Sequence, residues 1–211
     1  MPDIDRCLVL ASGSPRRLEL LGQVVDSFAV IISGVPEPVD GELTPAENVL
    51  QIARAKADAV ARTADGCLVL AADTDVVLDG EILGKPVDDT DAKRMLRRLR
   101  GRTHEVLTAV VVVDPLTYER REEIVCSSVT IHDLSDAEID AYVATGEPLD
   151  KAGGYAIQGE AASMVASVDG CYTNVVGLPL CTVGRLLRSA GVSIGAETGC
   201  PGPNGKPAHK H

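Results

Sequence analysis

The apolar residues of this chain gather in short continuous runs that alternate with stretches of helical spacing. A short continuous apolar run predicts a strand buried on both faces, and apolar residues three or four positions apart predict an amphipathic helix. Strands are predicted at 7–11, 28–32, 67–72, 76–78, 81–83, 106–113 and 124–131. Helices are predicted at 15–21, 44–62, 91–100, 135–146 and 179–190. This alternation of strands and helices indicates an α/β fold.

Turn and capping signals refine this outline. Thr44 and Glu47 form a predicted capping box at the start of the second helix. Two Asp-Gly pairs predict β-hairpins, at 79–80 and 169–170. Hairpins require antiparallel neighbours, so the sheet is expected to be mixed. The apolar periodicity fades after 191, and we therefore expect one domain over 1–194 and a disordered tail over 195–211.

Composition and charge limit the classes of partner. The formal net charge is −11, so duplex nucleic acid and anionic membranes are not expected as main partners. Aromatic residues are scarce, which argues against a stacking platform for single-stranded nucleic acid. No apolar run is long enough to span a bilayer, and the N-terminus does not resemble a signal peptide. These features predict a cytoplasmic location.

The cysteines lie far apart and include no C-x-x-C pair. Most of them sit in apolar or strand-like stretches, where small buried thiols are common. Reduced structural thiols are therefore the favoured interpretation, with a disulfide or a metal site as alternatives. The six positions are Cys7, Cys67, Cys126, Cys171, Cys181 and Cys200.

The segment after the first predicted strand is a candidate phosphate site. Ser12 and Ser14 lie in a Gly/Ser turn that leads into a helix, where free backbone N–H groups can bind an anion. Arg16 and Arg17 follow in the first helical turn, where adjacent positive charges are unfavourable unless an anion is present. Their guanidinium groups match the geometry of phosphate oxygens. An ordinary capped helix with two solvated arginines is the alternative.

A second candidate lies where the apolar run 67–72 meets Asp73, Thr74 and Asp75. If the strand ends there, these carboxylates lie at the carboxyl edge of the sheet, where ligands gather in open α/β folds. If the strand continues, Asp73 and Asp75 point to one face and Thr74 to the other. A carboxylate at this position can hold a metal ion or accept a proton from water. A turn-forming pair of aspartates is the alternative.

Other polar residues could join the same site. Lys56 falls inside the apolar stripe of the second predicted helix, so it needs an anionic partner unless it snorkels to the surface. Lys85 follows the first predicted hairpin closely enough to reach that site. Asp150 and Lys151 lie in a glycine-rich segment that permits close approach to a ligand. Gln158 follows this segment, and its amide can read a base edge.

The remaining charged residues are interpreted as structural. The basic residues between 93 and 102 are expected to form a solvated helix face, with a partner surface as the alternative. His104 and His132 lack partners at metal-ligand spacing, which favours packing or surface roles.

Four stretches of the chain resemble the Maf family of nucleotide pyrophosphatases, and they occur in the family's order between about Leu8 and Leu187. The stretches are LASGSPRR (10–17), AADTDVVLDGEILGKP (71–86), DKAGGYAIQG (150–159) and NVVGLPL (174–180). The resemblance implies an α/β fold of the Maf/inosine-triphosphatase type. In this fold helices flank a curved mixed sheet, and a cleft separates two lobes.

The resemblance also implies a reaction and roles for particular residues. Nucleoside triphosphates would be hydrolysed to the monophosphate and pyrophosphate. Asp73 would activate water, while Arg17, Lys56 and Lys85 would hold phosphates and Ser12 would belong to the phosphate loop. A divalent metal ion, Mg²⁺ or Mn²⁺, would assist.

The metal ligands implied by the resemblance are Asp73 and Glu37, the latter from an acidic loop position. The positions of Arg16, Thr74 and Gln158 are implied to sort substrates, and the combination is similar to the branch that hydrolyses dTTP and UTP. A 7-methyl-GTP pyrophosphatase of the same family is the alternative among enzymes, and a nucleotide-binding regulator of cell division is the alternative that is not an enzyme. A homodimer is also implied.

Overall fold

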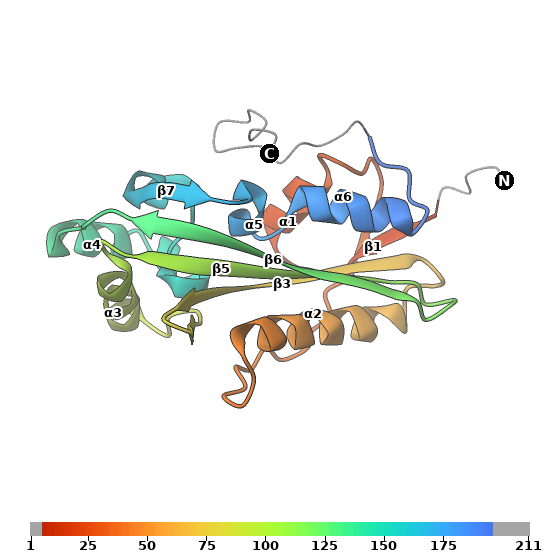
Figure 1. The fold of residues 1–211 in the computed structure, drawn as a ribbon, viewed down its shortest axis with the longest axis horizontal. Coiled ribbons are helices and arrows are strands. Elements are labelled where there is room, and N and C mark those ends of the chain that lie inside the picture. Colours follow the sequence, from red (N-terminus) through yellow and green to blue (C-terminus); the bar gives the residue numbers. More distant parts are fainter. Residues whose placement is uncertain (1–5, 196–211) are drawn as a thin grey trace.

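The computed structural model describes residues 6–195, so the predicted tail lies outside the described residues except for Gly195. Within these residues the strands form one seven-stranded sheet in the order β2-β1-β3-β5-β6-β7, with β4 paired to β3 (Figure 1). The strands are β1 Leu8–Leu10, β2 Ala29–Val30, β3 Leu68–Leu78, β4 Glu81–Leu83, β5 Thr103–Val113, β6 Arg120–Ile131 and β7 Val165–Asp169. β1 runs parallel to β2 and β3, and the other pairs are antiparallel. The mixed α/β sheet is therefore confirmed.

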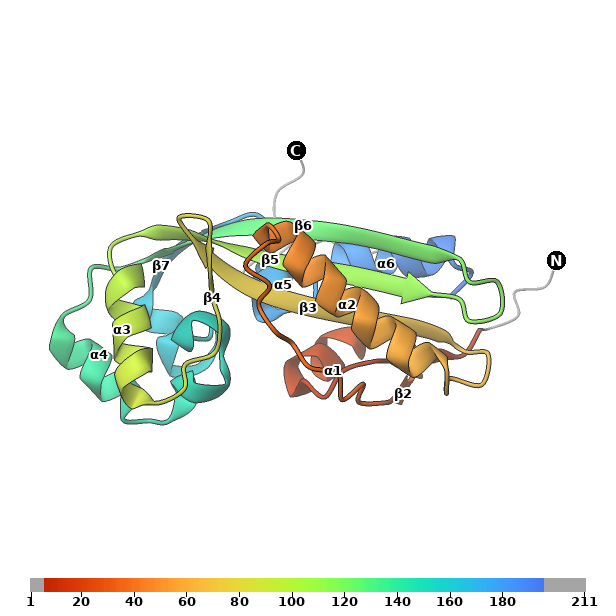
Figure 2. The ribbon, with the colours of Figure 1, turned by 90° about the horizontal axis from the view of Figure 1, so that it is seen from below.

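Helices flank both faces of this sheet and gather at one end. They are α1 Pro15–Leu21, α2 Pro45–Ala61, α3 Asp89–Leu99, α4 Asp136–Val143, α5 Tyr172–Val176 and α6 Leu180–Ser189, with 3₁₀ segments η1 Glu147–Asp150, η2 Ala152–Gly154 and η3 Gly159–Met164. Figure 2 shows two lobes, one around α3 and α4 and the other around α1, α2 and α6, joined by the long strands. Among the described residues, no helix is long and apolar enough to cross a membrane.

The two faces of the sheet pack with side chains of different size. On the α2 face, Ala53 and Ala57 of the helix are fully buried in a cluster that includes Ala71. On the opposite face, larger side chains such as Leu70 and Leu187 fill the core. Alanine at the contact positions lets α2 lie close to the strands, and this brings the polar residues of its inner face within reach of β3.

β3 does not stop at Asp73, because it continues to Leu78 as one strand. Its second half forms an antiparallel ladder with β5 on one side and β4 on the other, and these pairings satisfy the backbone groups. The strand that ends early is its neighbour β1, whose last residue, Leu10, pairs with Leu70. Asp73 therefore lies in the middle of its own strand but just beyond the end of the neighbouring one.

The two predicted hairpins have different outcomes. The turn at 79–80 is confirmed, because Leu78 pairs with Glu81 across it. The second hairpin prediction is wrong: after β7 the chain enters α5, and the partner of β7 is β6. Gly170 has φ +107°, and a Cβ there would come within 2.9 Å of Ser127 Oγ, so this glycine permits close approach to β6.

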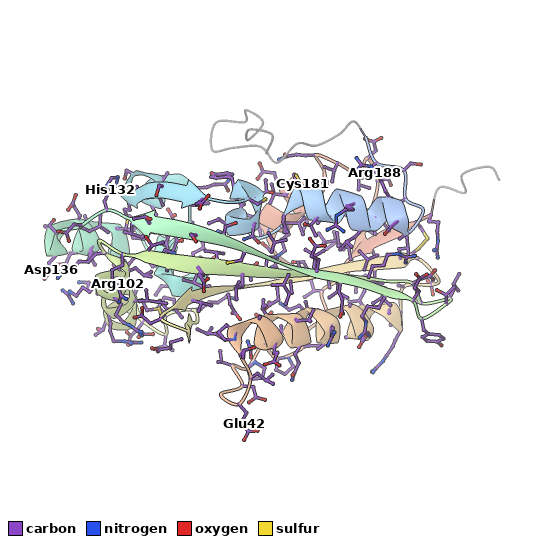
Figure 3. All side chains as sticks on the ribbon, viewed as in Figure 1. Glu42, Arg102, His132, Asp136, Cys181 and Arg188 are labelled. Atoms are coloured by element: carbon purple, nitrogen blue, oxygen red, sulfur yellow. A yellow bond between two sulfur atoms is a disulfide. The ribbon has the colours of Figure 1, made fainter. Side chains whose placement is uncertain are left out.

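The basic cluster around α3 lies at the surface, exposed or half-buried, and is ion-paired. Arg97 and Arg100 both contact Asp136 of α4, and Arg102 contacts Asp79 at 2.7 Å. Figure 3 places Arg102 and Asp136 at the same end of the molecule, while Glu42 projects from the loop before α2. Exposed pairs of this kind stabilise a fold only slightly. They do offset the positive charge, which agrees with the interpretation as a solvated helix face.

The prediction of reduced cysteines is wrong for part of the set. Cys7 and Cys67 form a disulfide, with Cα atoms 4.8 Å apart and a sequence separation of 60. The parallel register pairs Leu8 with Leu68, so the residues just before the two strands lie side by side. Cys181 is disulfide-bonded as well. Cysteine spacing could not reveal the Cys7–Cys67 bond, because the pairing of β1 with β3 brings these two residues together.

Replacing both Cys7 and Cys67 with serine is expected to lower the free energy of unfolding by about 2–4 kcal/mol, because the cross-link restricts the unfolded chain. Urea unfolding followed by circular dichroism measures the difference. Cys126→Ser is the matched control, since it removes an exposed thiol on β6. Equal midpoints for the double variant and the wild type would contradict the prediction.

Candidate active site

A cavity of about 480 Å³ lies between the two lobes and the middle of β3. The loop after β1 forms one side of it, and the segment that contains η2 forms another. Both Asp73 and Thr74 line this cavity although they alternate along β3. The end of β1 at Leu10 explains this, because it leaves β3 open to the cavity beside both faces of the sheet.

A buried lysine links two carboxylates at the floor of the cavity. Lys56 is 6% exposed, and its Nζ lies 2.6 Å from Asp73 Oδ1 and 2.7 Å from Glu37 Oε1. The apolar stripe of α2 turns this lysine toward the sheet, so of the two alternatives left by the sequence it is the inward, paired orientation that the structure shows. Its partners come from β3 and from the loop between β2 and α2, so the ammonium joins three separate segments.

The charges around Glu37 determine its protonation state. Burial alone would raise its pKa, but the hydrogen bond and charge of Lys56, together with the charges of Lys85 and Arg17, outweigh burial. The pKa of Glu37 therefore lies below its ordinary value, and the group stays a carboxylate at neutral pH. Lys85 Nζ lies 4.0 Å from Glu37 Oε2 and its side chain is largely exposed, so this cation stands at the mouth of the cavity.

Asp75 adds a further carboxylate that points to the same face as Asp73. Burial and the nearby charge of Asp73 raise the pKa of Asp75 to about 6. Asn48 of α2 donates from Nδ2 to Asp75 Oδ2 at 3.2 Å. Asn48 was not selected from the sequence, although its position about two helical turns before Lys56 places it on the buried face of α2 as well.

The loop after β1 presents the predicted serines. Ser12 is buried, and its Oγ accepts a hydrogen bond from the Ser14 backbone N–H at 3.1 Å. The backbone N–H of Ala11 donates to Leu70 O, which ties the start of this loop to β3. Both serines line the cavity.

The guanidinium of Arg17 is held by the protein on one side. Its Nε donates to Gly177 O at 2.9 Å, and its Nη2 donates to Thr74 Oγ1 at 3.0 Å. Burial lowers the pKa of Arg17, and the charges of Asp73 and Glu37 oppose that shift. An arginine carries five N–H donors, so these two contacts leave others for a ligand in the cavity that Arg17 lines.

The other predicted residues divide into two groups. Arg16, Asp150 and Lys151 line the cavity. Lys151 Nζ contacts the Asp150 carboxylate, and this contact outweighs burial and lowers the Asp150 pKa, with a smaller effect from Arg16. Gln158 is exposed, lies outside the cavity lining and hydrogen-bonds Tyr172. Its contact with a substrate stays a prediction.

Tyr155 and His104 form a buried pair that supports one wall of the cavity. Tyr155 lines the cavity, and its Oη lies 2.6 Å from His104 Nε2. His104 is 2% exposed, and its Nδ1 has no partner among the described residues. Burial lowers the pKa of His104 to about 4. The expected packing role of this histidine thus includes orienting an aromatic wall residue.

Cations, carboxylates and a Gly/Ser loop that converge on one cavity of a mixed α/β sheet define a protein that processes phosphorylated ligands. The comparisons with known proteins narrow this class. The family model described as Maf-like protein matches residues 7–190, and the chain belongs to this family.

Curated relatives from bacteria match most of this chain and nearly all of their own length. A dTTP/UTP pyrophosphatase of Geobacter metallireducens is 51% identical over 196 residues, which are 90% of this chain and 99% of the relative. One from Geobacter sulfurreducens is 52% identical and covers 87% of this chain and 96% of the relative. One from Anaeromyxobacter dehalogenans is 53% identical, with 89% and 95% covered.

His104→Gln is expected to make the free energy of unfolding depend less steeply on pH in acid. In wild type the unfolded state takes up a proton near pH 6.5, whereas burial delays uptake in the folded state to about pH 4. The free energy of unfolding should therefore fall by about 2–3 kcal/mol as the pH drops through this window. Glutamine keeps a partner for Tyr155 but does not titrate.

Urea unfolding at several pH values between 4 and 7 measures this slope. His132→Gln is the matched control, because His132 is exposed and its replacement removes one histidine without emptying a buried site. An unchanged slope in His104→Gln would show that another group causes the acid sensitivity.

Proposed function

We propose that this protein hydrolyses nucleoside triphosphates, dTTP and UTP above all, to the monophosphate and pyrophosphate. The observation that carries the proposal is the Lys56 ammonium between Asp73 and Glu37, beside a loop with Ser12 and across from Arg17. Carboxylates alone would repel a triphosphate, but cations at the floor, side and mouth of the cavity can neutralise it. The names of the curated relatives support the same reaction.

The residues present fit a divalent metal ion that a substrate shares. Among the described residues, no group of three His, Cys, Asp or Glu side chains is arranged to hold a metal. Asp73 and Glu37 nevertheless offer two carboxylates, and Mg²⁺ is commonly bound by one or two carboxylates together with substrate phosphates. A bound Mg²⁺ or Mn²⁺ would offset the charge of the triphosphate and polarise the phosphate oxygens.

The proposed chemistry assigns a separate task to each side chain. Water attacks the α-phosphorus, the bond to the oxygen that bridges the α and β phosphorus atoms breaks, and pyrophosphate leaves. Lys56 orients the Asp73 carboxylate through Oδ1, so the second oxygen is available to accept a proton from that water. Arg17 and Lys85 hold the phosphates and stabilise the charge that develops on them.

Substrate selection is proposed to involve Arg16, Thr74 and Gln158. The hydroxyl of Thr74 contacts Arg17 and Thr108, which supports an effect of Thr74 through the arginine. Arg16 belongs to the cavity wall beside the phosphate loop. A homodimer and a cytoplasmic location remain part of the proposal and rest on the family resemblance and the composition.

Pyrophosphate release from a nucleotide panel tests the reaction. With Mg²⁺ or Mn²⁺, dTTP and UTP are expected to give kcat/KM values about tenfold or more above those of CTP, GTP and 7-methyl-GTP. Removal of divalent metal with EDTA should abolish release, and added metal should restore it. Preference for 7-methyl-GTP would assign the protein to the other substrate class, and nucleotide binding without turnover would favour the regulatory alternative.

Asp73→Asn is expected to lower kcat by about 10²–10⁴-fold, because the amide cannot accept the proton of the attacking water. Calorimetric titration with dTTP should still detect binding, since the phosphate-holding cations remain. Asp79→Asn is the matched control, as Asp79 is an exposed aspartate in the turn just after the same strand. Normal turnover by Asp73→Asn would remove this residue from the proposed mechanism.

A further inference from the structure

Thr108 is a polar residue of β5 that has no assigned role and is completely buried. It pairs in register with Thr74 of β3, and the two hydroxyl oxygens are 2.9 Å apart. Its Oγ1 also lies 3.1 Å from the backbone oxygen of Asn174 in α5. The buried hydroxyl of Thr108 therefore links β5 to both β3 and α5.

The direction of these hydrogen bonds follows from the chemistry of the acceptors. A carbonyl oxygen can only accept, so the Thr108 proton goes to Asn174 O. Thr108 must then accept from Thr74, whose single hydroxyl proton is used in that bond. The lone pairs of Thr74 Oγ1 are consequently turned toward Arg17, which donates to it from Nη2 at 3.0 Å.

The second acceptor of Arg17 depends on the same junction. The Gly177 carbonyl oxygen accepts from Arg17 Nε. Gly177 is the C-cap of α5, the short helix that contains Asn174. Asn174 anchors this helix to the sheet, because its Nδ2 donates to Val106 O at 2.9 Å and to Ser127 Oγ at 3.0 Å. Gly177 has φ +118°, a conformation that favours glycine, so the carbonyl is set by this specific turn.

We propose that Thr108 is a positioning residue that fixes the orientation of the Arg17 guanidinium for phosphate. It acts by ordering the proton of Thr74 and by holding the helix that carries Gly177 O. This inference rests on the proposed function, because the benefit of a fixed guanidinium is realised when a phosphate group reacts in front of it. Without Thr108, the Thr74 proton can rotate toward Arg17 and oppose its N–H group.

Thr108→Val tests the proposal, because valine has nearly the same shape and no hydroxyl. The variant is expected to lose about tenfold in kcat/KM for dTTP, as buried polar partners lose a hydrogen bond. Thr108→Ser should restore most of the activity. Thr103→Val is the matched control, since Thr103 also lies on β5 and forms a similar hydroxyl pair, with Thr130 of β6, but is exposed.

A double-mutant cycle with Arg17→Lys separates positioning from a general effect on the fold. If Thr108 acts through Arg17, the valine change should cost less than about twofold in the Arg17→Lys background. Equal losses in both backgrounds would overturn the proposal, as would full activity of Thr108→Val. Circular dichroism and urea unfolding of each variant establish that the folded protein is being compared.

Binding of inorganic pyrophosphate provides the same cycle without turnover. A drop in affinity in Thr108→Val that disappears beside Arg17→Lys supports positioning even if no nucleotide is hydrolysed, in which case the proposed function alone fails. Hydrolysis of dTTP with no coupling between the two residues would leave the proposed function intact and overturn the role of Thr108. Absence of pyrophosphate binding by wild type, together with no turnover, would overturn both.

Discussion

Burial of the Lys56 ammonium is the constraint on which the rest of the site depends. An ammonium removed from water without anionic partners costs several kcal/mol, so the fold must supply carboxylates where this side chain ends. Asp73 and Glu37 do so at 2.6 and 2.7 Å. Since they come from different segments, the lysine fixes the positions of α2, β3 and the loop before α2 together. The alanines of α2 make this possible, because they bring the helix close to the strands.

A second constraint is the early end of β1. Its neighbour β2 ends level with it, whereas β3 continues to Leu78, so β3 is exposed to the cavity just past Leu10. Alternation along β3 then directs Asp73 to the carboxylate and lysine side and Thr74 to the arginine side. One strand thereby organises both halves of the site, and each half is connected to a separate buried network, which includes Asn48 on one face and Thr108 on the other.

Local signals predicted the parts of the fold that depend on neighbours in sequence. The capping box of Thr44 and Glu47 is present at the start of α2, and the hairpin at 79–80 pairs Leu78 with Glu81. Errors arose where distant pairing decides the outcome. An Asp-Gly pair at 169–170 has the same local chemistry as the confirmed turn, yet the segment after it packs as α5 against β5 and β6. The Cys7–Cys67 bond likewise follows from a parallel register that spacing alone does not encode.

Periodicity in the sequence was enough to predict the mixed α/β class and to place Lys56 within the apolar stripe of α2, because helical and strand periodicities assign each residue to a face. The family motifs were likewise readable from the sequence. The residues that pack opposite that face are set by the tertiary structure. Periodicity carries no information about a partner from another element, so the contacts of Lys56 with Glu37, of Asp75 with Asn48 and of Thr108 with Thr74 required the packed sheet and helices. The chemistry of the site depends on those pairings, since each sets the charge, proton position or orientation of a group that lines or supports the cavity.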